Sequence, residues 1–196
     1  MIVNILGNCD TRPLTYTLIK LFQSFGDVLL TSCNSKILRL SDTGESEGHY
    51  QNTMISYTPD GLDDFWDEFE YNPNDFEHKI IEGIISPDAD LFFYCQSMEE
   101  TEEEKEEQSF IDEEKLVKVK LYAKENGYFN ATTLYTLEEF ESLRDLCIIS
   151  EKLNKDVAKV MSKFMRVPEA NLFKILMTKN FIQPKTGTSL PKFKRR

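Results

Sequence analysis

Short apolar runs with the spacing of β-strands alternate along this chain with stretches whose apolar residues recur every three or four positions. The strand-like runs cover 2–6, 27–31, 53–58, 78–85 and 89–95, with a weaker one at 36–40. Helical spacing is clearest after Pro13, which favours a first helical turn, and it ends at Gly26. Such alternation is typical of βα units, so the pattern predicts an α/β fold: a mainly parallel sheet with flanking helices in three layers.

The remaining segments complete this prediction. We expect a polar loop over 42–51, a turn over 59–61 and one helix face carrying Leu62, Phe65, Trp66 and Phe69. Further on, the pattern predicts a strand over 117–122, a turn over 125–127, helices over 137–146, 150–165 and from 172, and a short strand over 147–150. The chain is then a single α/β domain over 1–183 with a basic tail over 184–196.

Composition narrows the function classes. The 23 basic and 34 acidic residues give a formal charge of −11, which argues against broad nucleic-acid binding because neutralising phosphates needs a basic face. The four cysteines, Cys9, Cys33, Cys95 and Cys147, form no CxxC pair, and most lie in apolar runs, as free thiols in a reducing compartment do. With neither a signal-peptide pattern nor a spanning apolar run in the sequence, we expect a cytoplasmic protein.

The first strand–loop–helix has the layout of a phosphate-binding turn. A glycine lets the backbone approach a phosphate, and the N–H groups at a helix N-terminus attract it. A working P-loop needs G-x-x-x-x-G-K-[ST], whereas Arg12, Pro13 and Leu14 stand where the second glycine, the lysine and the hydroxyl belong, and Asp10 adds a negative charge. The loop therefore reads as a degenerate P-loop, and any cofactor contact would come from a small set: Gly7, Asn8, Thr11, Arg12 and Thr15.

Four stretches in order, ILGNC, DVLLTS, HKIIEGIISPDADLFFYC and KVKLYAKENGYFN, resemble the ParA/MinD group of deviant P-loop ATPases. That group includes atypical members that serve as localisation or assembly factors, such as the pilus-assembly TadZ/CpaE proteins. The resemblance implies the fold over most of 1–150 and a homodimer. The signature lysines are absent, and Glu82 stands alone near the position of a Walker-B acid, so ATP hydrolysis is not expected.

Other candidate chemistry is weaker. His49 and His78 have no third ligand at metal spacing, so no metal site is expected, and Cys9, although near a helix start, has no histidine neighbour to activate it. The acid run over 99–107 is either a solvated helix face or a flexible loop, and its alternative role is docking a basic partner. The C-terminal helix, with the basic residues around it, is either packed on the sheet or in peripheral contact with a membrane.

Three functions remain open. The leading one is a non-catalytic, ParA/MinD-like protein that binds a protein partner as a scaffold, localisation or assembly factor and holds no cofactor. The second is a structural or accessory protein of a phage or mobile element, in keeping with the acidic, Lys-, Asn-, Phe- and Tyr-rich composition. The third is an enzyme that binds a phosphorylated ligand, with Arg12 as a phosphate fork in place of the lysine.

Overall fold

A sheet of seven strands forms the centre of the computed structural model, which describes residues 1–40, 47–62, 66, 69, 71–96, 101–120, 123–124, 127–128 and 151–178. The strands are β1 (Ile2–Gly7), β2 (Val28–Ser32), β3 (Glu47–Tyr50), β4 (Thr53–Tyr57), β5 (His78–Glu82), β6 (Leu91–Gln96) and β7 (Leu116–Lys120). Their order is β3-β4-β2-β5-β1-β6-β7, and every neighbouring pair is parallel except β3 with β4. The predicted α/β fold with a mainly parallel sheet is confirmed. A separate two-stranded ladder joins β8 (Ala123–Lys124) to β9 (Gly127–Tyr128).

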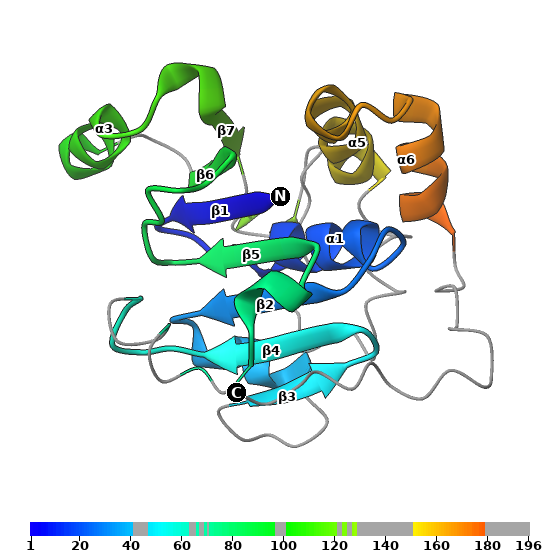
Figure 1. Cartoon of the computed structure of the whole chain (residues 1–196). Coiled ribbons are helices and arrows are strands. Elements are labelled where there is room, and N and C mark those ends of the chain that lie inside the picture. Colours follow the sequence, from blue (N-terminus) through cyan, green and yellow to red (C-terminus); the bar gives the residue numbers. More distant parts are fainter. Residues whose placement is uncertain are drawn as a thin grey trace.

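The α-helices of the described chain are α1 (Arg12–Phe22), α3 (Glu102–Ser109), α5 (Glu151–Met165) and α6 (Glu169–Met177). Short 3₁₀ helices cover Ser35–Leu40 (η1), Pro73–Asp75 (η2) and Glu113–Lys115 (η3). Helices α1, α5 and α6 pack against one another, whereas α3 lies away from them, beside the ends of β6 and β7 (Figure 1). The strands β1, β2, β4 and β5 all point the same way, so their carboxyl ends share one edge of the sheet.

Every residue of α1 is buried, including its charged ones. The helix begins with proline in its first turn, and the Thr17 hydroxyl donates to the Pro13 carbonyl at 2.7 Å, which satisfies a buried polar group inside the helix. Lys20 donates from Nζ to the carbonyls of Leu176 at 2.5 Å and Thr178 at 2.8 Å. These carbonyls close the C-terminal end of α6, where a helix dipole favours a cation, so the lysine joins α1 to α6.

The strands contribute alternate residues to different clusters of the core, as the period of two requires. Val3 and Ile5 of β1 belong to a large cluster with residues of α1, α5 and α6, whereas Leu6 packs with Phe92 and Tyr94 of β6 in a second cluster. A third cluster forms around four buried side chains: Leu29, Met54, Phe69 and Phe76.

Two predictions about local structure are wrong. The segment 36–40 is the 3₁₀ helix η1 and not a strand, because Asn34 begins a turn. The Asn34 side chain accepts a hydrogen bond from the Lys36 N–H, and the Asn34 backbone carbonyl accepts one from the Ile37 N–H. The loop expected over 42–51 contains β3, which pairs antiparallel with β4 through a turn at Gln51, whose φ is +56°. The strand is polar because it lies at the edge of the sheet, so it lacks the apolar signal.

Other predictions agree with the described structure. The strands at 2–6, 27–31, 53–58 and 89–95 appear within one or two residues of their predicted ends, and the run over 78–85 is a strand only as far as Glu82. The strand predicted over 117–122 is present over Leu116–Lys120, and its predicted end lies outside the described residues. Val167 and Pro168 separate α5 from α6. The acid run enters α3, which begins with a capping box at Thr101, so the helical reading of this run is confirmed over 102–107. Predictions for 137–150 and 184–196, for Phe65 and for Cys147 lie outside the described residues. Within the described residues, no helix is both long and apolar enough to span a membrane.

Candidate functional site

The predicted strand–loop–helix lies at the carboxyl edge of the sheet, where open α/β sheets bind their ligands. Gly7 ends β1, a loop of four residues follows, and Arg12 opens α1. From β1 the chain runs through α1 to β2, toward one end of the strand order, and from β6 it runs through α3 to β7, toward the other end. The switch point of this sheet therefore lies at the carboxyl ends of the neighbouring strands β1 and β6, and this is where a ligand site is expected.

The loop is closed by its own side chains. Asp10 accepts from Nε of Arg12 at 2.8 Å and from Nη2 at 2.6 Å, a bidentate pair in which the arginine is 3 % exposed. The same carboxylate also accepts from the Arg12 backbone N–H at 3.2 Å. An aspartate thus occupies the place at the helix start where a phosphate would bind in a phosphate loop.

The backbone donors of the first turn of α1 leave nothing for an anion. The Arg12 N–H goes to Asp10, Pro13 has no N–H, and those of Leu14 and Thr15 both donate to the Thr11 carbonyl at 3.0 Å. The Thr15 hydroxyl donates to the same carbonyl at 3.2 Å. Of the five predicted contact residues, Thr11, Arg12 and Thr15 are buried, while Asn8 is exposed.

Glu82 holds the loop to the neighbouring strands. It ends β5, is 1 % exposed, and accepts hydrogen bonds from the hydroxyls of Thr11 and Ser32. The two donors come from the loop after β1 and from the end of β2, the strands that flank β5. Sequence reasoning noted Glu82 by its position only. It missed Ser32, whose signal was its place at the end of a buried strand.

The carboxyl edge carries negative charge. Burial, together with the charges of Asp10 and Glu104, raises the pKa of Cys9 to about 12. Burial and the charge of Glu82 also raise the pKa of Cys33. The pKa of Tyr94 is raised by burial and by the hydrogen bond that its hydroxyl donates to Glu107 at 2.6 Å. A raised pKa means that the charged form of each of these groups is disfavoured here. The negative charge of a phosphate would be disfavoured at this edge for the same reason.

The raised pKa also bears on Cys9 as a nucleophile. At neutral pH the group is a thiol and not the thiolate that attacks an electrophile. Its surroundings are therefore the opposite of those that activate a cysteine, even though it stands near a helix N-terminus.

Glycine is required at the end of β1 by the next strand. Gly7 has φ +130°, and a Cβ there would lie 1.9 Å from the carbonyl oxygen of Cys95, its register partner in β6. The close approach that requires a glycine here is therefore that of the β6 backbone, and the predicted approach of Gly7 to a phosphate stays a prediction.

The two histidines stand apart. His49 lies on β3, and His78 begins β5 at the amino edge of the sheet. Among the described residues, no group of three or more His, Cys, Asp or Glu side chains could hold a metal ion. Leu172 and Leu176 of α6 are fully buried in the main core, so the apolar face of this helix packs on the domain, and the predicted membrane contact stays a prediction.

Comparisons with protein-family models, with curated proteins and with solved structures find no match to this chain.

Proposed function

We propose that this protein is a non-catalytic α/β protein that acts by binding a protein partner, as a scaffold, localisation or assembly factor. The observation that carries the proposal is the bidentate Asp10–Arg12 pair, which fills the start of α1 where a nucleotide phosphate would bind. A site closed by its own carboxylate is a poor receptor for a phosphorylated substrate, so function then lies in the surface.

Electrostatics support this reading. A phosphate about 4 Å from a single carboxylate is disfavoured by about 4 kcal/mol at an effective dielectric constant of 20. Asp10 lies in the loop, the charge of Glu104 acts on Cys9 of the loop, and Glu82 accepts a hydrogen bond from Thr11. Arg12, at the start of α1, is already paired with Asp10. Binding ATP would need to break that pair and also offset the repulsion.

We place helices on both faces of the sheet, in three layers, because alternate residues of β1 enter different core clusters and α3 lies away from α1, α5 and α6. The ParA/MinD resemblance is kept as a proposal on two grounds: the strand–loop–helix at β1, and an acid, Glu82, at the end of the adjacent strand. A cytoplasmic location fits the three free cysteines of the described chain.

Nucleotide binding to the purified full-length chain tests the proposal. We expect calorimetric titration with ATP or GTP and Mg²⁺ to show no saturable binding, and a thermal melt to show no shift, since a ligand at many times its Kd stabilises a fold by a few kcal/mol. Micromolar binding with turnover that is lost in both Arg12→Ala and Thr15→Ala would refute the proposal.

A second variant tests the closed loop as the cause. Asp10→Gly removes the carboxylate and leaves the Arg12 guanidinium and backbone N–H without their shared acceptor. We expect this variant to gain measurable affinity for pyrophosphate, and the matched variant Asp88→Gly, in an exposed turn elsewhere, to gain none. If Asp10→Gly stays as inert as the wild type while remaining folded, the Asp10–Arg12 pair is not what keeps phosphates out.

A further inference from the structure

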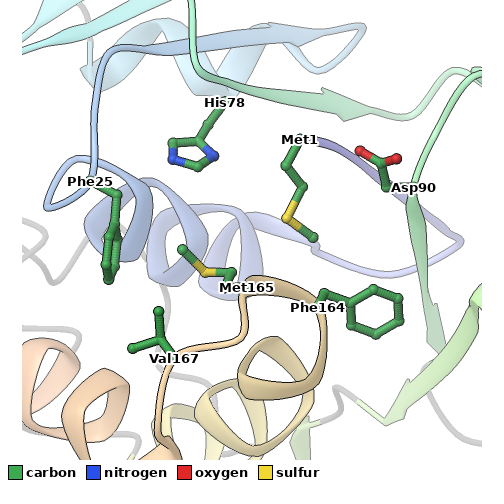
Figure 2. A pocket seen from close by; sticks show the side chains of 7 residues that line it. All are labelled: Met1, Phe25, His78, Asp90, Phe164, Met165 and Val167. Carbon is green, nitrogen blue, oxygen red and sulfur yellow. The ribbon is translucent and has the colours of Figure 1, made fainter.

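A cavity of about 530 Å³ opens at the amino edge of the sheet, the end opposite to the closed loop. Its lining comes from the starts of β1, β5 and β6 and from the segments that follow α1 and end α5: Met1, Phe25, His78, Asp90, Phe164, Met165 and Val167 (Figure 2). The volume is within the range of about 300–1,000 Å³ that small-molecule sites occupy.

The lining is mostly apolar and includes aromatic rings that face solvent. The side chains of Phe25 and Phe164 are 39 % and 37 % exposed, and they are two of the four large apolar residues that the described part of the chain leaves exposed. In Figure 2 they lie on opposite sides of the hollow, with Met165 between them. Aromatic rings and flexible thioethers together form a surface suited to a flat ring, because sulfur makes favourable contacts with aromatic edges.

His78 provides the polar group. Its ring stacks on Phe22 at 4.4 Å between centroids with 4° between the planes, which holds the imidazole in one orientation. Nδ1 is buried, and no described residue makes a hydrogen bond with it. A buried nitrogen without a hydrogen bond needs an explanation in a well-packed fold. Because Nδ1 is buried, the other ring nitrogen, Nε2, is the one through which His78 can meet a ligand.

The charges around the cavity favour an uncharged occupant. Burial, followed by the positive charge at the chain start, lowers the pKa of His78 to about 4, so the imidazole is neutral at physiological pH. Asp90 at the exposed rim repels anions, and the positive charge at the chain start, whose ammonium donates to the Glu77 carbonyl, repels cations. Oδ2 of Asp90 already accepts from the Ile2 N–H at 2.7 Å.

We infer that this cavity binds a small, uncharged aromatic molecule that carries one hydrogen-bonding group, with its ring against Phe25, Met165 and Phe164 and its polar atom toward His78. The inference goes beyond the proposed partner binding and does not rest on it. The cavity is at the opposite edge of the sheet from Asp10 and Arg12, so the two ideas fail separately.

Two probes of the same shape test the inference on the full chain. Indole is flat, uncharged and has one N–H, and indene has the same ring outline without the nitrogen. We expect saturation-transfer NMR to show saturable indole binding with a Kd in the millimolar range or tighter. Indene should bind roughly fivefold more weakly, because it lacks the N–H and makes one hydrogen bond fewer. The methyl signals of Met1 and Met165 should shift with indole.

Variants assign the binding to this cavity. Val167→Trp fills it and should abolish binding, while Phe164→Ala removes one aromatic wall and should weaken it. Phe110→Ala is the matched control, because Phe110 is 78 % exposed and does not line the cavity. His78→Phe keeps a ring for the stack on Phe22 and removes both nitrogens, so it should reduce indole binding to the level of indene.

Several results would overturn the inference. These are absence of indole binding at millimolar concentrations, binding unchanged in both Val167→Trp and Phe164→Ala, or equal binding of indole and indene. If Val167→Trp does not fold, Phe164→Ala against Phe110→Ala decides. Tighter binding of tryptamine or indole-3-acetate than of indole would refute an uncharged ligand.

Discussion

Replacing Gly7 by alanine should destabilise this protein far more than the same change at another glycine of similar backbone conformation. The Cβ would meet the Cys95 carbonyl oxygen at 1.9 Å, and the two atoms must separate to at least 3.0 Å. Since Cys95 is the register partner of Gly7, that movement displaces β6 from β1 in the centre of the sheet.

The magnitude has two parts. A residue with a side chain at φ +130° costs about 1–3 kcal/mol in backbone strain. Distorting the end of the β1–β6 ladder loses two or three backbone hydrogen bonds at about 1 kcal/mol each. We therefore expect a loss of about 3–6 kcal/mol, a large share of the roughly 5–15 kcal/mol by which a domain is stable.

Gly61→Ala separates the two parts. Gly61 has φ +101°, but nothing is within 4 Å of a Cβ built there. This variant should lose only about 1 kcal/mol, because the strain is partly offset by the lower entropy of the unfolded alanine chain.

Urea unfolding followed by circular dichroism measures both variants, and the comparison uses the midpoints at constant slope. Equal losses for Gly7→Ala and Gly61→Ala would refute the close approach of β6 as the reason for glycine at the end of β1. If the close approach of β6 is confirmed, it explains why a glycine ends β1 without any phosphate at this loop.

Three further outcomes follow from the structure. In an NMR pH titration the imidazole of His78 should have its midpoint near 4, and a midpoint near 6.5 would contradict the burial of the ring. Because the folded pKa lies below the ordinary 6.5, the contribution of the neutral imidazole to stability is complete above pH 6.5 and declines as the pH falls from 6.5 toward 4. Under native conditions an alkylating reagent should modify the exposed Cys33 well before the fully buried Cys95, which should react only on unfolding; comparable rates, read by mass spectrometry, would contradict this order. Glu82→Ala should lower the free energy of unfolding by about 2–4 kcal/mol because two buried hydroxyls lose their acceptor, whereas the exposed Glu106→Ala should change it by less than about 0.5 kcal/mol; similar urea midpoints for the two would refute the role of Glu82.

Local patterns were sufficient for most of the sheet. The runs that became β1, β2 and β6 are mostly apolar because these strands are buried on both faces, and such runs are visible in the sequence. Strand β3 was missed because Glu47–Tyr50 is polar, and it is a strand only through its hydrogen bonds to β4. The 3₁₀ helix η1 was missed because its start depends on the Asn34 side chain and not on the apolar residues after it.

Helix α1 shows the limit of a pattern within one element. Its apolar spacing predicted a helix, but spacing did not indicate that the structure buries all sides of it, Lys20 included. The second covering comes from α5 and α6, some 130 residues later in the chain, and the charge of Lys20 is satisfied by carbonyls at the end of α6. No local spacing contains that information.

The sequence by itself determined that the loop after β1 lacks the lysine, hydroxyl and second glycine of a P-loop, since these are matters of residue type at fixed spacing. Only the tertiary structure decided what the loop does with the residues it has. The Asp10 carboxylate pairs with the Arg12 guanidinium. Glu82 accepts a hydrogen bond from Thr11, 71 positions away along the chain, because β5 lies between β1 and β2 in the sheet. Strand order depends on packing across the whole sheet, so neither the contacts between strand ends at the carboxyl edge nor the cavity at the amino edge can be predicted from spacing alone.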